Sequence, residues 1–196
     1  MNLAIVDYGM GNLKSVCNAF RYLGAEPTLV KTPSNLRADK IVIPGVGAFG
    51  DGARNLAPFV PRLKEEIASG ALLLGICLGM QVLFESSEES PRARGMEVMR
   101  GRVVKIRTSL RLPHIGWNSI KIRKKRCPLL RGLDREPMYF VHSYHAVPSE
   151  DVVSATTRYG SEVTAAVWKG DTYGTQFHPE KSGRAGLKIL ENFLEL

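Results

Sequence analysis

The sequence predicts an α/β fold: a doubly wound, mixed and mostly parallel sheet with helices on both faces and antiparallel additions in the C-terminal half. Two observations support this prediction. Up to residue 76, short apolar runs alternate with segments of helical spacing, which is the β-α-β order of a parallel sheet. After residue 98, short apolar runs follow one another with only turns between them, as antiparallel strands do. The 196 residues and 44% hydrophobic content suit a single domain over residues 1–196.

In the N-terminal half, the first strand is expected at residues 2–7 and leads through a glycine-rich turn into a helix. Asn12 can cap this helix, apolar residues recur at helical spacing from Leu13 to Leu23, and Gly24 ends it. In a sheet wound in this way, a site lies at the carboxyl ends of the parallel strands. The other expected elements are strands at 27–30 and 40–43, helical sequence with a proline interruption at 51–69, and a buried strand at 71–74.

The C-terminal half contains several short strand candidates and one final helix. An amphipathic helix is expected from about Ser182, because Leu187, Leu190 and Leu194 fall on one of its faces. We expect the strands to extend the sheet rather than to form a second domain. They lie at residues 98–107, 119–123, 138–141, 151–156, 163–168 and 172–177.

The most informative segment is G-I-C-L-G at residues 75–79, which lies between an apolar strand and the start of a helix. This is the pattern of a nucleophile elbow with cysteine in place of serine, and its glycines let the backbone bend sharply. The free N–H groups of the following helix favour a thiolate at Cys77. A buried, inert cysteine is the alternative interpretation of this segment taken alone.

A second motif, H-P-E at residues 178–180, follows a strand-like segment near the C-terminus. The proline favours an extended His178, and residues two apart in an extended segment point the same way. Glu180 can therefore orient the imidazole of His178. With Cys77, the three residues form a set of nucleophile, base and carboxylate suited to acyl transfer. His142 and His145 are alternative bases, but neither has a carboxylate at this offset.

Two further segments are placed to support this chemistry. The turn P-G-V-G at residues 44–47 follows a strand at the same sheet edge, so the N–H groups of Val46 and Leu78 are candidate oxyanion donors. Gln81 lies one helical turn after Cys77, where it can contact a substrate. An ordinary glycine turn and a surface glutamine are the alternatives. Neither this turn nor the one at residues 8–12 has the spacing of a phosphate-binding loop.

The composition limits the classes of function. The net charge is +8, but no nucleic-acid-binding motif accompanies the basic segment at 121–126, so a solvated or partner-docking face is the preferred interpretation. Cys17, Cys77 and Cys127 are too widely spaced for a disulfide framework or a metal cluster, and we expect no metal and no cofactor. Without a bilayer-spanning run or a signal segment, a cytoplasmic protein is expected.

Together these residues resemble class I (triad) glutamine amidotransferases and, within that family, the glutaminase subunits of imidazole glycerol phosphate synthases. The stretch at 113–118, and valine in place of the second glycine of the common P-G-G, point to the narrower group. The resemblance covers the whole chain. It rests on D-Y-G-M-G-N at 7–12, P-G-V-G at 44–47, G-I-C-L-G at 75–79, P-H-I-G-W-N at 113–118, F-V-H-S-Y at 140–144 and H-P-E-K at 178–181.

The resemblance implies that Cys77 attacks the side-chain amide of glutamine, that His178 moves the protons and that Glu180 orients it. Ammonia then passes to a cyclase subunit, a (β/α)8 barrel bound as a heterodimer, in histidine biosynthesis. The implied substrate-binding residues are Gly45, Gly47, Gln81, Ser143 and Tyr144. The candidates for the docking face are Gly9, Asn12, His114, Trp117 and Lys181, of which the last could pair with an acidic residue of the barrel.

The valine of the P-G-V-G turn leads to a hypothesis about regulation. A β-branched residue restricts how the backbone at 45–47 can rotate. We hypothesise that the N–H of Val46 faces away from the oxyanion at rest and turns inward when partner and ligand bind.

Other functions stay open at this point. The same chemistry could serve a synthase for anthranilate or pyridoxal phosphate. An intracellular cysteine peptidase of the elbow fold is a second option, although those place a histidine directly after the nucleophile, where this chain has Leu78. A non-catalytic binding protein and a nucleic-acid binder are the remaining ones.

Overall fold

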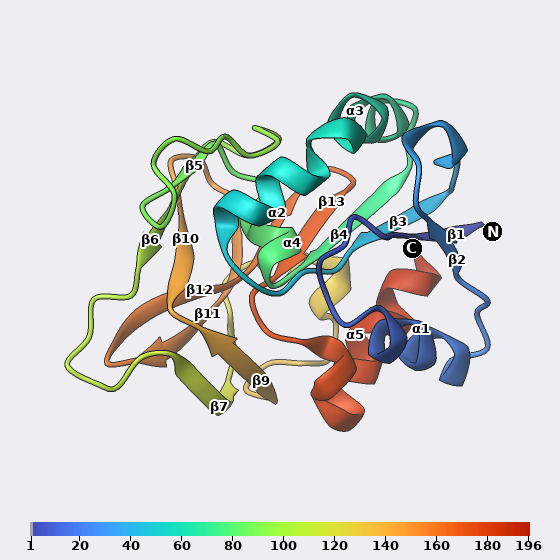
Figure 1. The fold of residues 1–196 in the computed structure, drawn as a ribbon. Coiled ribbons are helices and arrows are strands. Elements are labelled where there is room, and N and C mark those ends of the chain that lie inside the picture. Colours follow the sequence, from blue (N-terminus) through green and yellow to red (C-terminus); the bar gives the residue numbers. More distant parts are fainter. Residues whose placement is uncertain (1) are drawn as a thin grey trace.

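Eight strands form the central sheet of this computed structural model, which describes residues 2–196 (Figure 1). Five of them are parallel, in the order β2-β1-β3-β4-β13, and the antiparallel strands β12, β11 and β8 extend one edge. The strands are β1 (Leu3–Val6), β2 (Thr28–Val30), β3 (Lys40–Ile43), β4 (Leu72–Ile76), β8 (Lys121–Ile122), β11 (Val153–Tyr159), β12 (Ser161–Lys169) and β13 (Thr172–Thr175).

Helices cover both faces of the sheet, with α1 and α5 on one side and α2 and α3 on the other (Figure 1). Alternate residues of β1 supply the two cores: Leu3 and Ile5 pack with the α1 and α5 side, and Ala4 and Val6 with the α2 and α3 side. The predicted doubly wound class is thus confirmed. The helices are α1 (Leu13–Tyr22), α2 (Phe49–Leu56), α3 (Val60–Ala68), α4 (Leu78–Gln81) and α5 (Gly183–Glu195), and the 3₁₀ turns are Pro33–Asn35, Ala57–Phe59, Pro128–Leu130 and Pro179–Lys181.

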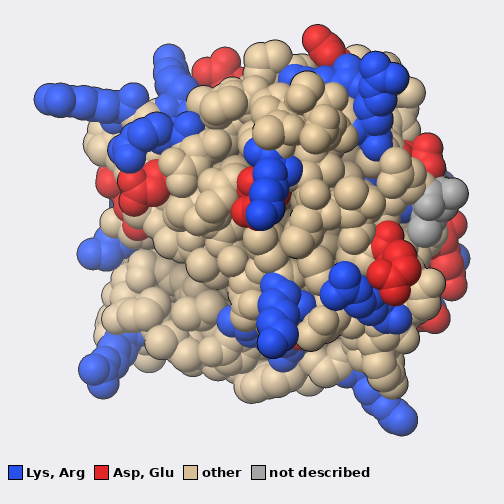
Figure 2. Space-filling view, turned by 45° about the vertical axis from the view of Figure 1, so that its right-hand side comes forward, with Lys and Arg blue, Asp and Glu red and all other residues tan. Residues whose placement is uncertain are grey.

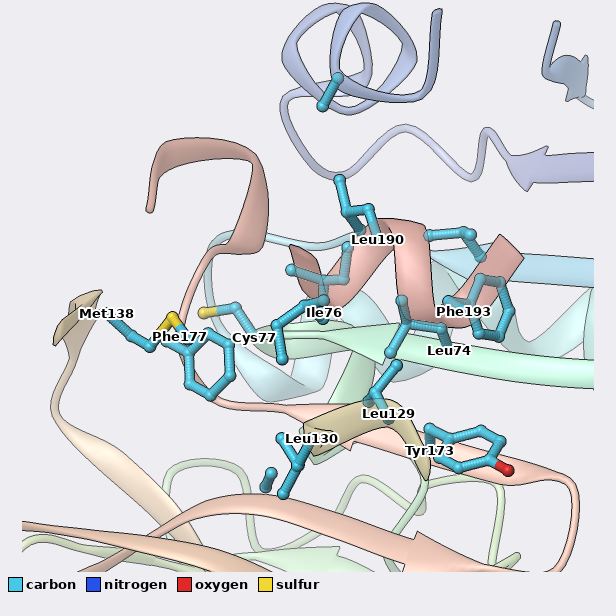
Figure 3. Packing of buried hydrophobic residues seen from close by; sticks show 14 of the residues in the cluster. Leu74, Ile76, Cys77, Leu129, Leu130, Met138, Tyr173, Phe177, Leu190 and Phe193 are labelled. Atoms are coloured by element: carbon cyan, nitrogen blue, oxygen red, sulfur yellow. The ribbon is translucent and has the colours of Figure 1, made fainter. Parts of the chain in front are cut away.

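Figure 3 shows the core under α5. Leu74 and Ile76 of β4 point toward Leu190 and Phe193 of that helix. Cys77 follows at the end of β4, so the sheet and its helical layer hold the carboxyl end of this strand in place. The apolar core therefore extends up to Cys77, the predicted nucleophile.

The proline interruption predicted within residues 51–69 divides the segment into α2 and α3. Pro58 lies in the 3₁₀ turn between them, and Pro61 lies in the first turn of α3. A proline has no N–H to donate, so it is accommodated at such helix starts and not within a continuous helix.

Two small sheets in the C-terminal half correct the prediction that every strand there extends the main sheet. β10 pairs with β6 and β6 with β5, while β7 pairs only with β9. The sequence did not mark β7, because Gly116 and alternate exposed positions leave it without an apolar run. The strands are β5 (Ser86–Ser87), β6 (Gly101–Lys105), β7 (His114–Ser119), β9 (Pro137–His142) and β10 (Tyr144–Pro148).

Charged side chains on the face shown in Figure 2 lie in separate positions, with acidic groups beside some of the basic ones. Within the basic segment 121–126, Arg123 pairs with Glu162 and Lys124 with Asp151. None of the helices between residues 2 and 196 combines the length and apolar character that crossing a bilayer requires.

Candidate active site

The elbow at Cys77 joins the end of β4 to the start of α4. Cys77 has φ 55° and ψ −108°, a conformation that residues other than glycine rarely adopt. A Cβ on Gly75 would lie 2.5 Å from the Gly79 oxygen, and a Cβ on Gly79 would lie 1.8 Å from the Ile43 oxygen. Both glycines are thus required where the turn passes close to neighbouring backbone.

The helix after the elbow is short. α4 contains only Leu78–Gln81, so the predicted contribution of a helix dipole to the Cys77 thiolate is confined to a single turn.

Strand β13 brings the H-P-E motif to the elbow. The N–H of Cys77 donates to the Thr175 carbonyl at 2.7 Å, which ties the end of β4 to the end of β13. Beyond it, Nδ1 of His178 donates to Oε1 of Glu180 at 2.8 Å, and both side chains are 2% exposed. The contact predicted from the two-residue spacing is present. We call residues 176–182 the base side of the site.

The electrostatics at His178 favour a protonated imidazole. Burial lowers the pKa of His178, but the Cys77 sulfur and the Glu180 carboxylate oppose it and raise that pKa to about 10. The second ring nitrogen, Nε2, is buried and has no hydrogen-bond partner of ordinary geometry among residues 2–196. It is therefore available to exchange a proton at Cys77, which makes the pair suited to nucleophilic catalysis.

The turn at residues 44–47, which we call the oxyanion turn, lies on the other side of Cys77. The N–H of Leu78 donates to the Gly45 carbonyl at 3.3 Å. In a planar trans peptide, C=O and N–H point in opposite directions, so the N–H of Val46 points away from that of Leu78. The two predicted oxyanion donors thus do not converge: the Gly45 oxygen occupies one, and the other is turned outward.

The oxyanion turn is packed on one side and open on the other. A Cβ on Gly45 would meet the Tyr8 hydroxyl at 2.5 Å and Leu78 Cβ at 2.9 Å, whereas Val46 is 40% exposed and Gly47 has φ +107°. Tyr8, in the glycine-rich turn after β1, has a buried hydroxyl without a partner among the described residues. Its pKa is raised by burial and by the nearby Cys77.

Gln81 and the 143–144 backbone lie together, as a shared substrate site requires. Gln81 is 5% exposed, so it is not the surface glutamine of the alternative interpretation, and its Nε2 donates to the Tyr144 carbonyl at 3.0 Å. The Ser143 carbonyl accepts from the N–H of Ile106. Both carbonyl oxygens are thus engaged within the chain.

Gln176 is the residue that sequence reasoning missed. It is fully buried, its Oε1 accepts from Gln81 at 3.1 Å, and its Nε2 lies 3.7 Å from the Cys77 sulfur. The signal was present, because Gln176 precedes His178 by two residues in an extended segment, the same spacing that identified Glu180.

The docking-face residues differ in exposure. Trp117 is 54% exposed and Lys181 lies over the Tyr139 ring at 5.9 Å, while Gly9 is exposed and Asn12 caps α1 by accepting from Ser15. The structure corrects the prediction that His114 lies on the docking face, because its side chain is fully buried and cannot contact a partner directly. Its ring stacks on those of Phe140 and Tyr159.

The other two cysteines are packing residues. Cys17 and Cys127 are both buried in the core on the α1 and α5 side, where burial raises their pKa values. Cys127 is only 1% exposed although it follows the basic segment 121–126.

Comparisons with known proteins agree over nearly the whole length. The family model for glutamine amidotransferase class-I matches residues 4–196. The imidazole glycerol phosphate synthase subunit HisH of Methanothermobacter thermautotrophicus is 49% identical over 195 residues, covering 99% of this chain and 98% of that protein. The subunit HisH of Methanocaldococcus jannaschii is 45% identical, covering 99% of each.

Solved structures give the same fold. The structure of PurLQS from Thermotoga maritima is similar with a TM-score of 0.79 at 22% identity, covering 100% of this chain and 99% of that one. A crystal structure of a glutamine amidotransferase is similar with a TM-score of 0.79 at 18% identity, covering 99% and 98%. At these identities, the likeness concerns the fold alone.

Proposed function

This chain belongs to the glutamine amidotransferase class-I family, and we propose that it is the glutaminase subunit of an imidazole glycerol phosphate synthase. It hydrolyses glutamine to glutamate and ammonia and supplies the ammonia to a cyclase subunit in histidine biosynthesis. The observation that carries the assignment is the near-complete match to the subunit HisH relatives at up to 49% identity. The buried contact of His178 and Glu180 beside Cys77 supports the chemistry.

The reaction begins with the Cys77 thiolate. Its sulfur attacks the side-chain carbonyl carbon of glutamine, and the carbonyl oxygen gains the negative charge. His178 gives a proton from Nε2 to the leaving nitrogen, so the C–N bond breaks and ammonia departs from a γ-glutamyl thioester. A water then adds, His178 takes one of its protons, and glutamate leaves with the thiolate restored. Glu180 holds the ring through Nδ1 throughout.

The oxyanion needs donors that the resting turn does not provide. Leu78 and Val46 serve as donors once the Gly45–Val46 peptide rotates, because this removes the Gly45 carbonyl from Leu78 and turns the Val46 N–H inward. Partner and ligand binding drive the rotation. A site gated in this way does not waste glutamine when no acceptor for ammonia is present.

Glutamine is held between the elbow and the small sheets. Its amino-acid part lies against Gly45, Gly47 and Gln81 and against the backbone at Ser143 and Tyr144. The hydrogen bond from Gln81 to the Tyr144 carbonyl supports a shared site for these residues.

The partner is a cyclase of (β/α)8 barrel type that forms a heterodimer with this chain in the cytoplasm. The docking face includes Gly9, Asn12, Trp117 and Lys181, of which Trp117 offers a large exposed aromatic surface. Direct transfer has a physical reason, because ammonia that escapes into neutral water is mostly protonated and loses its nucleophilic lone pair.

The deciding experiment measures glutamate release from glutamine by the purified chain, alone and with a cognate cyclase subunit plus its nucleotide ligand. Cys77→Ala is the control. Low activity alone, strong activity in the mixture and none in the variant support both the assignment and the gate. Strong activity of the chain alone rejects the gate, and no activity with a demonstrated complex rejects this synthase as the destination of the ammonia.

A further inference from the structure

The chain contains two glutamines, and they form one hydrogen-bonded series that ends at the Cys77 sulfur. Gln81 donates from Nε2 to the Tyr144 carbonyl at 3.0 Å and to Oε1 of Gln176 at 3.1 Å. Gln176 in turn presents its Nε2 to Cys77 Sγ at 3.7 Å. Residues from α4, β10 and the end of β13 thus meet through two amides.

A backbone carbonyl determines the direction of this series. The Tyr144 oxygen can only accept, so Gln81 must present its NH2 group, whose second proton then faces Gln176. Gln176 must answer with its oxygen, and its own NH2 is left to face the sulfur. The reverse orientation of Gln176 would oppose two NH2 groups and place an oxygen against Cys77. The Tyr144 carbonyl, acting through Gln81, therefore determines that Gln176 presents its NH2 group to the sulfur.

Burial makes this donor effective. Gln176 is 0% exposed and Gln81 is 5% exposed, so little water competes for the bond. A hydrogen bond to a charged group is stronger than one to its neutral form, and an N–H donor therefore favours the thiolate over the thiol. The single turn of α4 leaves room for such a contribution.

We propose that Gln176 is a further catalytic residue, whose amide N–H stabilises the Cys77 thiolate while its oxygen accepts from Gln81. The proposal rests on the function assigned to Cys77 above. Gln81 also belongs to the proposed substrate site. The binding of glutamine and the stabilisation of the thiolate therefore both depend on the Gln81–Gln176 pair. Other titratable groups near Cys77 are His178 and Glu180 on the base side and Tyr8 from the turn after β1.

The test is the pH dependence of Cys77 alkylation by iodoacetamide in the full chain, measured on the Cys77 peptide by mass spectrometry so that Cys17 and Cys127 do not interfere. Gln176→Glu replaces the donor with a carboxylate of the same shape. We expect its midpoint to rise by about one pH unit or more, which is about a tenfold slower reaction at neutral pH. Gln176→Met removes the donor without adding charge, and a smaller shift in the same direction is expected.

Controls separate this effect from damage to the core. Asn192→Asp makes the same amide-to-acid change at a buried site on α5, where the amide bonds the carbonyls of Leu129 and Arg131, and it should leave the profile in place. Circular dichroism checks the fold of each variant. If the Gln176 variants do not fold, Gln81→Met keeps Gln176 and removes what orients it, and the midpoint should again rise.

Profiles of folded Gln176 or Gln81 variants that superimpose on that of the wild type overturn the proposal. The assigned function fails differently: the wild type in the complex would then release no more glutamate than Cys77→Ala does. Wild-type activity that is lost in Cys77→Ala, together with unchanged alkylation profiles, rejects the role of Gln176 alone.

Discussion

On the base side of Cys77, residues are buried and held by hydrogen bonds. On the opposite side, the oxyanion turn is partly exposed, and its Gly45 carbonyl accepts from the N–H of Leu78. His178 donates its N–H to the Tyr139 carbonyl, and its own carbonyl accepts from the Ser182 hydroxyl at 2.6 Å. In the oxyanion turn, Val46 is 40% exposed and the Gly45 carbonyl takes the N–H that an oxyanion needs.

In the proposed reaction, this difference separates proton transfer from the stabilisation of the oxyanion. Proton transfer relies on a side chain fixed by a strand end, and the isolated chain already holds it. Charge stabilisation relies on backbone in a loop, where conformational change is least costly. A regulator that acts on the loop can change the rate without disturbing the nucleophile.

The largest expected effect concerns the base side. Glu180→Gln should lower kcat for glutamine in the activated complex by about a hundredfold to a thousandfold, because an amide cannot balance an imidazolium and can hold the ring in the wrong tautomer. Steady-state glutamate release measures this. Glu191→Gln, at a surface carboxylate of α5, is the control and should match the wild type. A loss below threefold would show that the base side is not a formed catalytic unit.

The packed part of the oxyanion turn gives the next effect. Gly45→Ala adds a Cβ within 3.0 Å of Tyr8, Leu78 and Gly79 atoms, so the free energy of unfolding should fall by about 1–3 kcal/mol. Chemical denaturation measures it. Val46→Ala, in the same turn but exposed, should stay within about 0.5 kcal/mol of the wild type. Equal effects of the two changes would mean that the turn is loose throughout.

Strand β9, whose Tyr139 carbonyl accepts from the N–H of His178, should show a pH effect on stability. His142 donates from Nδ1 to the Tyr144 carbonyl, and burial lowers its pKa to about 3. In the unfolded chain His142 binds a proton near pH 6.5, whereas in the folded chain it stays neutral down to about pH 3. The free energy of unfolding therefore falls as the pH drops from about 6.5 toward 3. Between pH 7 and 4.5 the loss from this group is on the order of 2 kcal/mol.

His142→Gln should reduce this acid sensitivity. Denaturant midpoints of both proteins across the range give the difference, in which the carboxylates common to the two cancel. His114 and His145 also have lowered pKa values from burial and should keep part of the dependence. Parallel curves for the two proteins would show that a group other than His142 causes the acid sensitivity.

The smallest expected effect sharpens the comparison most directly. Val46→Gly frees the backbone of the oxyanion turn, and glutamate release by the chain without its partner should rise about threefold to tenfold. The rate of the activated complex should change little. An unchanged partner-free rate would show that the side chain of Val46 does not restrain the turn.

What the sequence could predict follows the range of each physical rule. The cap at Asn12, the glycines around Cys77 and the facing of His178 and Glu180 depend on residues within four positions, and all of these appear in the structure. The same two-residue spacing also applies to Gln176 and His178. No local pattern, however, indicated that Gln81, 95 residues away in the sequence, would form a hydrogen bond with Gln176.

Nonlocal pairing explains the failures. The burial of His114 depends on rings from β9 and β11, and the separate sheet of β7 and β9 depends on strands that bear no strong apolar pattern. The bond from Leu78 to Gly45 joins two turns, and no local pattern states which way a peptide between them faces. The sequence therefore identified the candidate donors Val46 and Leu78 but not the direction in which their N–H groups point.

In the proposed gate, the rigid Gly45–Val46 peptide makes the rate depend on the fraction of molecules in which this peptide has rotated. One rotation both withdraws the obstructing oxygen and delivers the missing proton donor, so no partly active arrangement lies between the two positions. A modest rate then counts the few molecules in the competent position, each working at full speed, rather than many working slowly. An effector that doubles the rate has doubled that fraction and left the chemistry of each molecule as it was.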